Sequence, residues 1–270
     1  GRNVSITSGA GGTQIAFNWS LAPVPGTITF DGDATSASGF TAQADGAVSV
    51  GKITATTGDI TLTSNLAGVS ASGTLSAPGA IAVTAATSAQ VLGDVSAGAS
   101  YDVNAQSVLL GNGGSAIQMA NSGVSIVAGS GGVNALGTFT LQSDADGSAT
   151  PGSAIDRLQI DSGGSIDLGA ASHLIGGATP TGLTDQRQAL VSLNAPTASV
   201  RVGQVDANSL AVDATGGLAT LAGPGETVVS ASVRDGSTTS SHSSAVCRCW
   251  AGNRMLSGGA RTFPLTKRSA

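Results

Sequence analysis

The most regular feature of this chain is a five-residue phrase in which a glycine precedes alternating apolar and polar positions. The phrase occurs at 26–30 (GTITF), 46–50 (GAVSV), 58–62 (GDITL), 79–83 (GAIAV), 137–141 (GTFTL) and 164–168 (GSIDL). Alternation of this kind predicts a β-strand with one buried face. The glycine favours a turn before each strand, because glycine adopts positive φ at little steric cost.

Several of these phrases recur at intervals of about 20 residues. Tyr101 and Val103 continue the series one interval beyond the phrase at 79–83, and the spacing becomes irregular after Val103. Shorter apolar pairs, such as Val69 with Leu75, fall between the phrases. Each interval therefore holds two or three short strands separated by turns, which is typical of one coil of a solenoid.

The spacing predicts an all-β fold, a parallel β-helix (β-solenoid) with coils of about 20 residues over residues 1–230. At a strand spacing of about 4.8 Å, eleven or twelve coils would form a rod of about 55 Å. The inward ladder is expected to place Ile60 over Ile81 and Leu62 over Val83, followed by Tyr101 and Val103. Thr61, Thr63 and Ala82 are expected on the opposite side of the same strands, because side chains alternate along a strand.

The composition supports a narrow core filled by small side chains. Only 10% of the residues are charged and 3% are aromatic, while glycine accounts for 40 of the 270 residues. A β-sandwich also has short strands, but it needs no phrase that recurs near 20 residues and its core usually holds large aromatics. Here the whole chain has two Trp, one Tyr and five Phe.

Charge and hydropathy exclude several classes of protein. The mean hydropathy of +0.23 argues against a disordered chain. The net charge of −5 provides no basic patch for nucleic acid. The sequence contains no run of 18 apolar residues, which is the pattern that would indicate a membrane-spanning helix. The chain starts at Gly1 without a charged-then-apolar leader, so we expect it to be a piece of a longer or processed product.

The last forty residues differ from the rest. All acidic residues lie at or before Asp235, whereas both cysteines (Cys247 and Cys249) and several arginines follow it. We interpret 231–270 as an atypical basic tail, disordered or translated out of frame, and we expect residues from about 236 to 270 not to join the β-helix. A tail that binds an anionic surface is the alternative. The absence of cysteine from the body of the chain suits an exported protein.

Three motifs resemble reactive sites, and each has a simpler interpretation. "IDSGGS" at 160–165 resembles the surroundings of a serine-protease nucleophile, but the only bases, His173 and His242, both follow Ser162, so we interpret it as a turn. "GAVSVGKI" at 46–53 lacks the Ser or Thr and the helix of a phosphate-binding loop. Cys247 and Cys249 are at most half of a metal site.

The acidic turns offer one candidate for calcium, formed by Asp144, Asp146 and Asp156. The spacing does not fit an EF-hand loop, which needs Gly at position six and Glu at position twelve, so Asp-rich turns are the favoured interpretation. We predict no catalytic residues, no cofactor and no other metal ligands.

The phrases "GDITLTS", "GAIAVTA", "GTFTLQS" and "GSIDLGA" resemble the repeats of filamentous haemagglutinins and related two-partner-secreted exoproteins, over about residues 1–230. The resemblance implies a right-handed parallel β-helix in a large bacterial protein that is secreted or held at the cell surface, often as an adhesin. It implies an outer-membrane transporter for the full-length protein and glycans or proteins of host or neighbouring cells as partners.

The sequence thus leads to one expectation about function and one alternative. The expectation is a structural or adhesive shaft segment without catalytic activity. The alternative is a polysaccharide-active β-helix enzyme or a tailspike-like glycan-binding module. An enzyme should gather several acids and a base on one face, but residues 1–230 hold only five basic residues, far apart: Arg2, Lys52, Arg157, Arg187 and Arg201.

Overall fold

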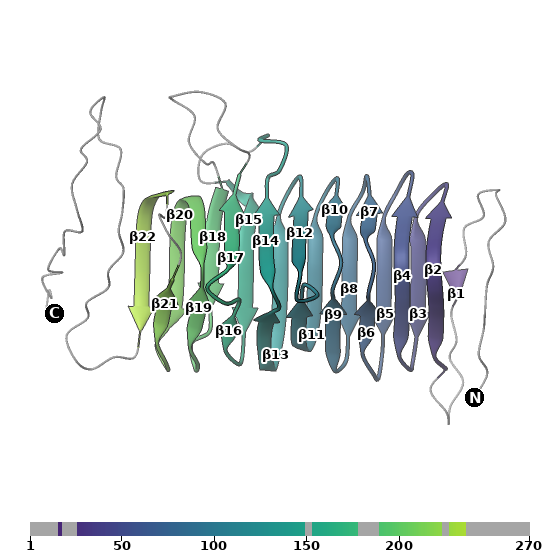
Figure 1. Ribbon diagram of the computed structural model, residues 1–270, viewed down its shortest axis with the longest axis horizontal. Coiled ribbons are helices and arrows are strands. Elements are labelled where there is room, and N and C mark those ends of the chain that lie inside the picture. The colour runs from purple at the N-terminus through teal and green to yellow at the C-terminus, as the bar shows by residue number, and fades with distance from the viewer. Residues whose placement is uncertain (1–15, 18–25, 149–152, 178–188, 223–226, 236–270) are drawn as a thin grey trace, which may run out of the picture.

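The computed structural model describes residues 16–17, 26–148, 153–177, 189–222 and 227–235. These residues form 22 strands and no helix. The strands pair in parallel within one continuous sheet, which winds into a β-solenoid of about eight turns, spaced about 21 residues apart. Figure 1 shows the coils stacked side by side along a rod. The predicted all-β solenoid is confirmed, while the hand of the coil stays a prediction.

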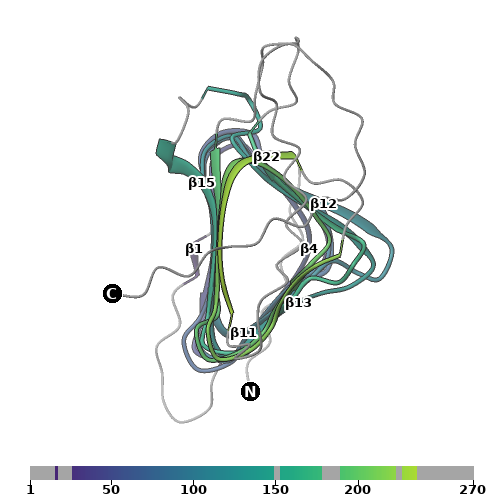
Figure 2. The same cartoon turned by 90° about the vertical axis from the view of Figure 1, so that its left-hand side faces the viewer.

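The cross-section has three sides, which Figure 2 shows end-on. Face 1 consists of β3 (Phe40–Ala44), β5 (Ile60–Ser64), β8 (Ile81–Ala85), β15 (Ser153–Ser162), β18 (Ala189–Asn194), the first halves of β11 (Tyr101–Leu110) and β13 (Val124–Ala135), and the second halves of β20 (Gln204–Ala214) and β22 (Thr227–Asp235). The short β1 (Ala16–Phe17) pairs with β3 at one end of this face.

Face 2 follows face 1 along each coil. It consists of β6 (Val69–Ala71), β9 (Ser88–Val91), β16 (Ile166–Asp167), β19 (Val200–Val202), β21 (Ala219–Leu221), the first parts of β2 (Ile28–Ser36) and β4 (Val48–Ala55), and the second halves of β11 and β13.

Face 3 closes the triangle. It consists of β7 (Leu75–Ala77), β10 (Val95–Ala97), β12 (Ser115–Ala120), β14 (Thr138–Ser143), β17 (Ser172–Gly176), the second parts of β2 and β4, and the first parts of β20 and β22.

The predicted register of face 1 is confirmed. Ile60 pairs with Ile81 and Leu62 with Val83, and the next coil continues the two ladders with Tyr101 and Val103. All six side chains are buried, with exposures of 0–1%. Thr61, Thr63 and Ala82 lie on the outer side of the same strands and are half-buried. The period of two along each strand therefore separates the dry interior from the surface, as the alternation predicted.

The interior is a stack of aliphatic ladders with few large rings. Alanine, valine, leucine and isoleucine form most of the buried cluster, and Tyr101 and Phe139 are its largest fully buried side chains. Each fully buried Leu, Ile or Val contributes about 1.5–3 kcal/mol relative to an exposed one. Backbone N–H groups donate to carbonyls of the next coil at the corners as well, for example from Ile60 to Ala80 and from Ile81 to Ser100, both at 2.9 Å.

The expected number of eleven or twelve coils is wrong. The solenoid has about eight turns. The estimate included residues 1–25, of which the structure describes only 16–17, and two successive coils are much longer than the others. Val124 pairs with Leu158, and Leu158 pairs with Val191. Each of these two coils therefore contains an extra segment of chain between two faces, which we call an excursion. The first excursion leaves after β14 and the second after β17, both at the corner between face 3 and face 1.

The solenoid continues past the expected boundary at residue 230. β22 pairs with β20 as far as Asp235, which lies beside Ala214. Val233 packs against the core cluster. The rest of the expected tail, residues 236–270, lies outside the described residues, so the prediction that it does not join the β-helix stays a prediction.

Candidate functional site

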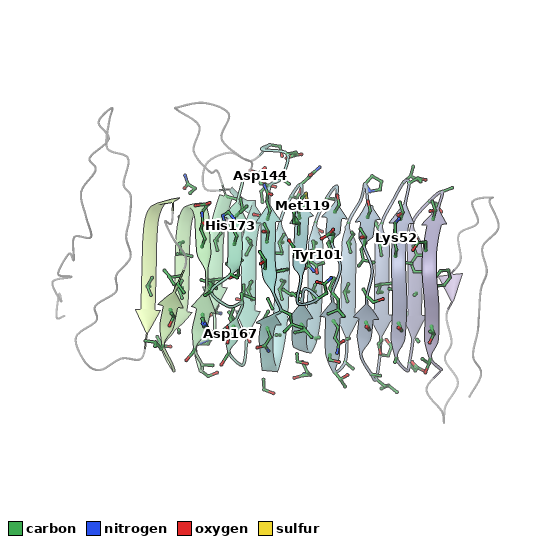
Figure 3. All side chains as sticks on the ribbon, viewed as in Figure 1. Lys52, Tyr101, Met119, Asp144, Asp167 and His173 are labelled. Carbon is green, nitrogen blue, oxygen red and sulfur yellow. The ribbon has the colours of Figure 1, made fainter. Side chains whose placement is uncertain are left out.

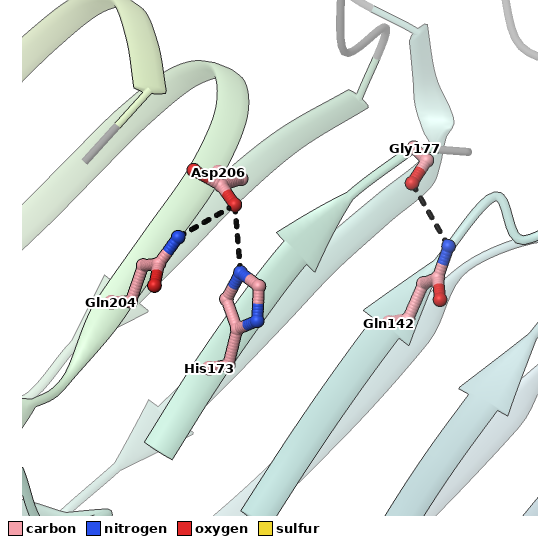
Figure 4. Close-up of polar contacts among 5 residues, drawn as sticks. All are labelled: Gln142, His173, Gly177, Gln204 and Asp206. Carbon is pink, nitrogen blue, oxygen red and sulfur yellow. Dashed lines mark hydrogen bonds and ion pairs between the residues drawn. The ribbon is translucent and has the colours of Figure 1, made fainter. Parts of the chain in front are cut away.

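A group of three polar side chains joined by hydrogen bonds lies on the outer side of face 3. His173 comes from β17, and Gln204 and Asp206 come from β20, the neighbouring strand in the sheet. The register places His173 beside Gln204 and Ile175 beside Asp206, while Leu174 and Val205 between them point into the core. Two strands thus bring an imidazole, an amide and a carboxylate to one outer surface (Figure 4).

Asp206 is the centre of this group. The Nε2 atom of His173 lies 2.7 Å from Oδ2 of Asp206, and the side-chain amide of Gln204 donates to the same oxygen at 3.0 Å. The side chain of Asp206 is 11% exposed and that of His173 is 31% exposed. A carboxylate that is mostly removed from water needs such donors, because an unpaired buried charge costs several kcal/mol.

A second contact lies close by and joins the two long coils. The side-chain amide of Gln142, at the end of β14, donates to the carbonyl oxygen of Gly177 at 3.0 Å, just beyond the end of β17. Ser153 pairs with Ala189, so the strands that return from the two excursions also lie side by side. Polar contacts from Gln142 to Asp206 therefore border the corner at which both excursions leave the solenoid (Figure 4).

The chemistry available to this group is the binding and positioning of polar groups. Asp206 holds the ring of His173 through Nε2, and no described residue forms a hydrogen bond with Nδ1. Nucleophilic catalysis would also need an activated hydroxyl or thiol within hydrogen-bond reach of the imidazole. No such contact occurs among the described residues, so the group has a base and its orienting acid without a nucleophile.

Ser162 is not part of this group. It lies on face 1, where it pairs with Ala128, and it is 5% exposed. Its hydroxyl oxygen accepts a hydrogen bond from the N–H of Gly164 at 3.1 Å, and the chain then enters β16. The interpretation of this segment as a turn before a strand is confirmed. His242, the other base considered, lies outside the described residues.

The three aspartates considered for calcium lie in and after the first excursion. Asp144 is fully buried with φ of 50°, next to the edge of face 3 (Figure 3), while Asp146 is exposed and accepts the N–H of Ser148 at 3.0 Å. Asp156 is half-buried. Within the part of the chain that the structure describes, no three His, Cys, Asp or Glu side chains come close enough together to hold a metal ion.

The remaining motifs have structural roles or fall outside the described residues. The segment at 46–53 enters β4, with Val48 and Val50 buried, and Lys52 forms an exposed ion pair with Asp33 at 3.5 Å. The resemblance to a phosphate-binding loop is therefore accidental. Cys247 and Cys249 lie outside the described residues.

Among the residues that the structure describes, few aromatic rings are available to stack on sugars. Tyr101 and Phe139 are fully buried, and Phe30 packs edge-on against Phe40 with ring centroids 6.0 Å apart. No helix among the described residues has the length and apolar character to cross a membrane.

The sequence did not indicate the group formed by His173 and Asp206. The two residues are far apart in the chain and belong to no motif, and the second excursion lies between them. The signal that could have found them is the register: once Leu174 is aligned with Val205 as an inward pair, His173 and Asp206 share the outer surface. No family model matches this chain, and neither does any curated protein or solved structure.

Proposed function

We propose that this chain is a shaft segment of a large exported bacterial surface protein and that it has no catalytic activity. The observation that carries the proposal is the uninterrupted stack of coils. Each coil hydrogen-bonds to the next on all three faces, so the hydrogen bonds run along the rod. Such a rod holds whatever is attached to its far end at a fixed distance.

The surface composition supports the same role. Outward positions of face 1 carry mainly short polar side chains, such as Thr41, Thr61, Thr63 and Thr84. A surface of this kind keeps a long rod soluble without forming a deep binding site. In the proposed setting the rod is secreted or held at the cell surface, and an outer-membrane transporter exports the full-length protein. The attached regions contact glycans or proteins of host or neighbouring cells.

The proposal is tested on intact cells that produce the protein. An antibody raised against the purified solenoid should label these cells before lysis, and protease added outside should remove the label. Labelling only after lysis would contradict an exported shaft. A cytoplasmic protein of the same cells, probed in parallel, controls for leakage.

A glycan-binding or glycan-cleaving module is the second candidate, and it is favoured by the group of His173, Gln204 and Asp206 beside the two excursions. Amide, imidazole and carboxylate side chains are the groups that hydrogen-bond to sugar hydroxyls. A panel of neutral and acidic polysaccharides separates the two candidates, with new reducing ends as the measure of cleavage and retention on the immobilised chain as the measure of binding. The shaft proposal expects neither.

If a polysaccharide is retained, two matched variants locate the contact. Gln204→Ala removes an amide from this group, whereas Thr63→Ala removes a hydroxyl from face 1. Loss of retention in the first variant alone would favour a glycan-binding module, and equal retention in both would exclude this group as the site.

A further inference from the structure

Asn112 is the only asparagine in the chain that is followed directly by a glycine. It lies in the turn at 111–114, which joins β11 on face 2 to β12 on face 3. Asn112, Gly113 and Gly114 are all exposed. A Cβ atom at Gly113 would meet no atom within 4 Å, so the outer side of this residue is open, while Gly137 of the following coil lies against its carbonyl group.

The turn is fixed at both of its ends but not at its centre. The N–H of Gly111 donates to Val91 at 3.0 Å in the preceding coil, and the carbonyl of Gly114 accepts from Thr138 at 2.8 Å in the following coil. No described group accepts a hydrogen bond from the N–H of Gly113. The nitrogen of Gly113 can therefore react without breaking a hydrogen bond that the described part of the fold needs.

The side chain of Asn112 folds back over this nitrogen. Its Oδ1 atom accepts a hydrogen bond from the N–H of Gly114 at 2.9 Å, which closes a turn around Gly113. This hydrogen bond restricts the side chain of Asn112 to conformations folded over Gly113, which reduces the entropy lost when the nitrogen of Gly113 attacks the amide carbon. The N–H of Gly114 also points at the oxygen that gains negative charge during the attack, which stabilises the tetrahedral intermediate.

We propose that Asn112 is a site of spontaneous deamidation that the fold leaves reactive. The nitrogen of Gly113, after losing its proton to water, attacks Cγ of Asn112, and the new C–N bond closes a five-membered succinimide. The bond from Cγ to the side-chain nitrogen breaks, and this nitrogen leaves as ammonia after taking up a proton. Water then opens the ring at either carbonyl and gives aspartate or isoaspartate.

Asn65 provides the matched comparison within the same rod. It too is exposed and lies in a turn between strands, but Leu66 follows it. The N–H of Leu66 donates to the carbonyl of Asp45 at 2.9 Å, and the side-chain amide of Asn65 donates to Oδ1 of Asp45 at 2.9 Å. Both reacting groups of Asn65 are therefore held by hydrogen bonds, and the Leu66 side chain crowds the attack.

The reaction would mark the age of each molecule at a defined corner of the rod. Either product adds one negative charge to the exposed turn. Isoaspartate also adds one carbon to the main chain between Gly111 and Gly113, although the two hydrogen bonds to the neighbouring coils do not involve this segment. The solenoid should therefore stay folded while the corner between faces 2 and 3 changes in charge and shape.

The test follows the purified full chain at mildly alkaline pH and physiological temperature by peptide mapping with mass spectrometry. We expect the peptide that contains Asn112 to convert to aspartate and isoaspartate, with isoaspartate in excess, while the peptide that contains Asn65 keeps its amide. A synthetic peptide with the sequence LLGNGGSAI should convert no faster than the folded chain, because the turn around Gly113 is not fixed in the free peptide.

Two outcomes would overturn the proposal. The first is a folded chain that keeps the amide of Asn112 after the synthetic peptide has lost it, because the fold would then protect the site. The second is equal conversion in a Gly113→Ala variant, because its Cβ should slow the attack. Circular dichroism checks that this variant folds, and the peptide LLGNAGSAI provides the same comparison if it does not.

Discussion

The pair formed by Tyr101 and Gln118 offers the sharpest test of the interior. The hydroxyl of Tyr101 donates to Oε1 of Gln118 at 3.0 Å, and both residues are 0% exposed. Nε2 of Gln118 donates to the carbonyls of Val91 at 2.9 Å and Gly93 at 3.1 Å. The four residues thus form a connected polar group in a mainly aliphatic interior, and Figure 3 shows Tyr101 near the middle of the rod.

Tyr101→Phe removes the hydroxyl and leaves a ring of nearly the same volume. Oε1 of Gln118 then becomes a buried acceptor without its donor, which costs about 1–3 kcal/mol. In a Gln118→Leu background the same change should have the opposite sign. There the hydroxyl of Tyr101 has already lost its acceptor, so its removal relieves a buried unsatisfied donor and stabilises the chain.

Urea unfolding followed by circular dichroism measures the free energy of unfolding of the four chains in this cycle. The expected result is a lower midpoint for Tyr101→Phe alone and a higher midpoint for the double variant than for Gln118→Leu. Thr63→Val, which changes a polar group on the outer surface, serves as the control and should shift the midpoint little. An equal loss from Tyr101→Phe in both backgrounds would refute the reasoning, because the hydroxyl and the amide would then be energetically independent.

Further predictions concern the ladder, the single tyrosine and the contacts between coils. Leu62→Asp should cost several kcal/mol by placing an unpaired charge in the core, whereas Thr63→Asp should change the urea midpoint little; equal shifts would contradict the solenoid register. Burial raises the pKa of Tyr101 above its value of about 10 in the unfolded chain, so the free energy of unfolding should be unaffected below that pH and should fall above it by about 1.4 kcal/mol per pH unit. Tyrosinate absorbance that appears before unfolding would contradict this. Gly98→Ala should lower the midpoint although Gly98 is exposed, because the new Cβ would overlap the carbonyl oxygen of Pro78 in the neighbouring coil, and an unchanged midpoint would contradict so close an approach.

The alternation was enough to predict the ladders of face 1. Ile60, Leu62, Ile81 and Val83 are large and apolar, so only one register buries them, and a slip by one residue would expose them all. The same reasoning fails at β12, where Ala116, Gln118 and Ala120 point inward while Ile117 is 43% exposed. The amide of Gln118 is tolerated inside because the hydroxyl of Tyr101, on another face of the same coil, and two carbonyls of the preceding coil satisfy it.

The number of coils and the candidate site depended on contacts that no local pattern encodes. An excursion at a corner lengthens a coil without changing the register of the strands on either side, so the chain length alone overestimated the number of coils. The group around Asp206 forms only when β20 pairs with β17, across the second excursion. Its residues are ordinary outward positions when each strand is considered alone.

The central claim is that successive coils stack at one strand spacing whatever the length of chain between them. One outward row of face 1 contains Thr63 and, further along the rod, Asp161, Asn194 and Asp213. These three residues lie four, five and six coils from Thr63, respectively. Nitroxide labels on cysteines at Thr63 and at each of the other three positions, in a chain whose native cysteines are replaced by serine, allow the distances to be measured by double electron–electron resonance. The stack predicts distances from Thr63 of about 19, 24 and 29 Å, in equal steps of about 4.8 Å. The steps should be equal although the chain from Asp161 to Asn194 is much longer than the chain from Asn194 to Asp213. Distances that follow the length of the intervening chain, or that fail to increase from one position to the next, would contradict the solenoid.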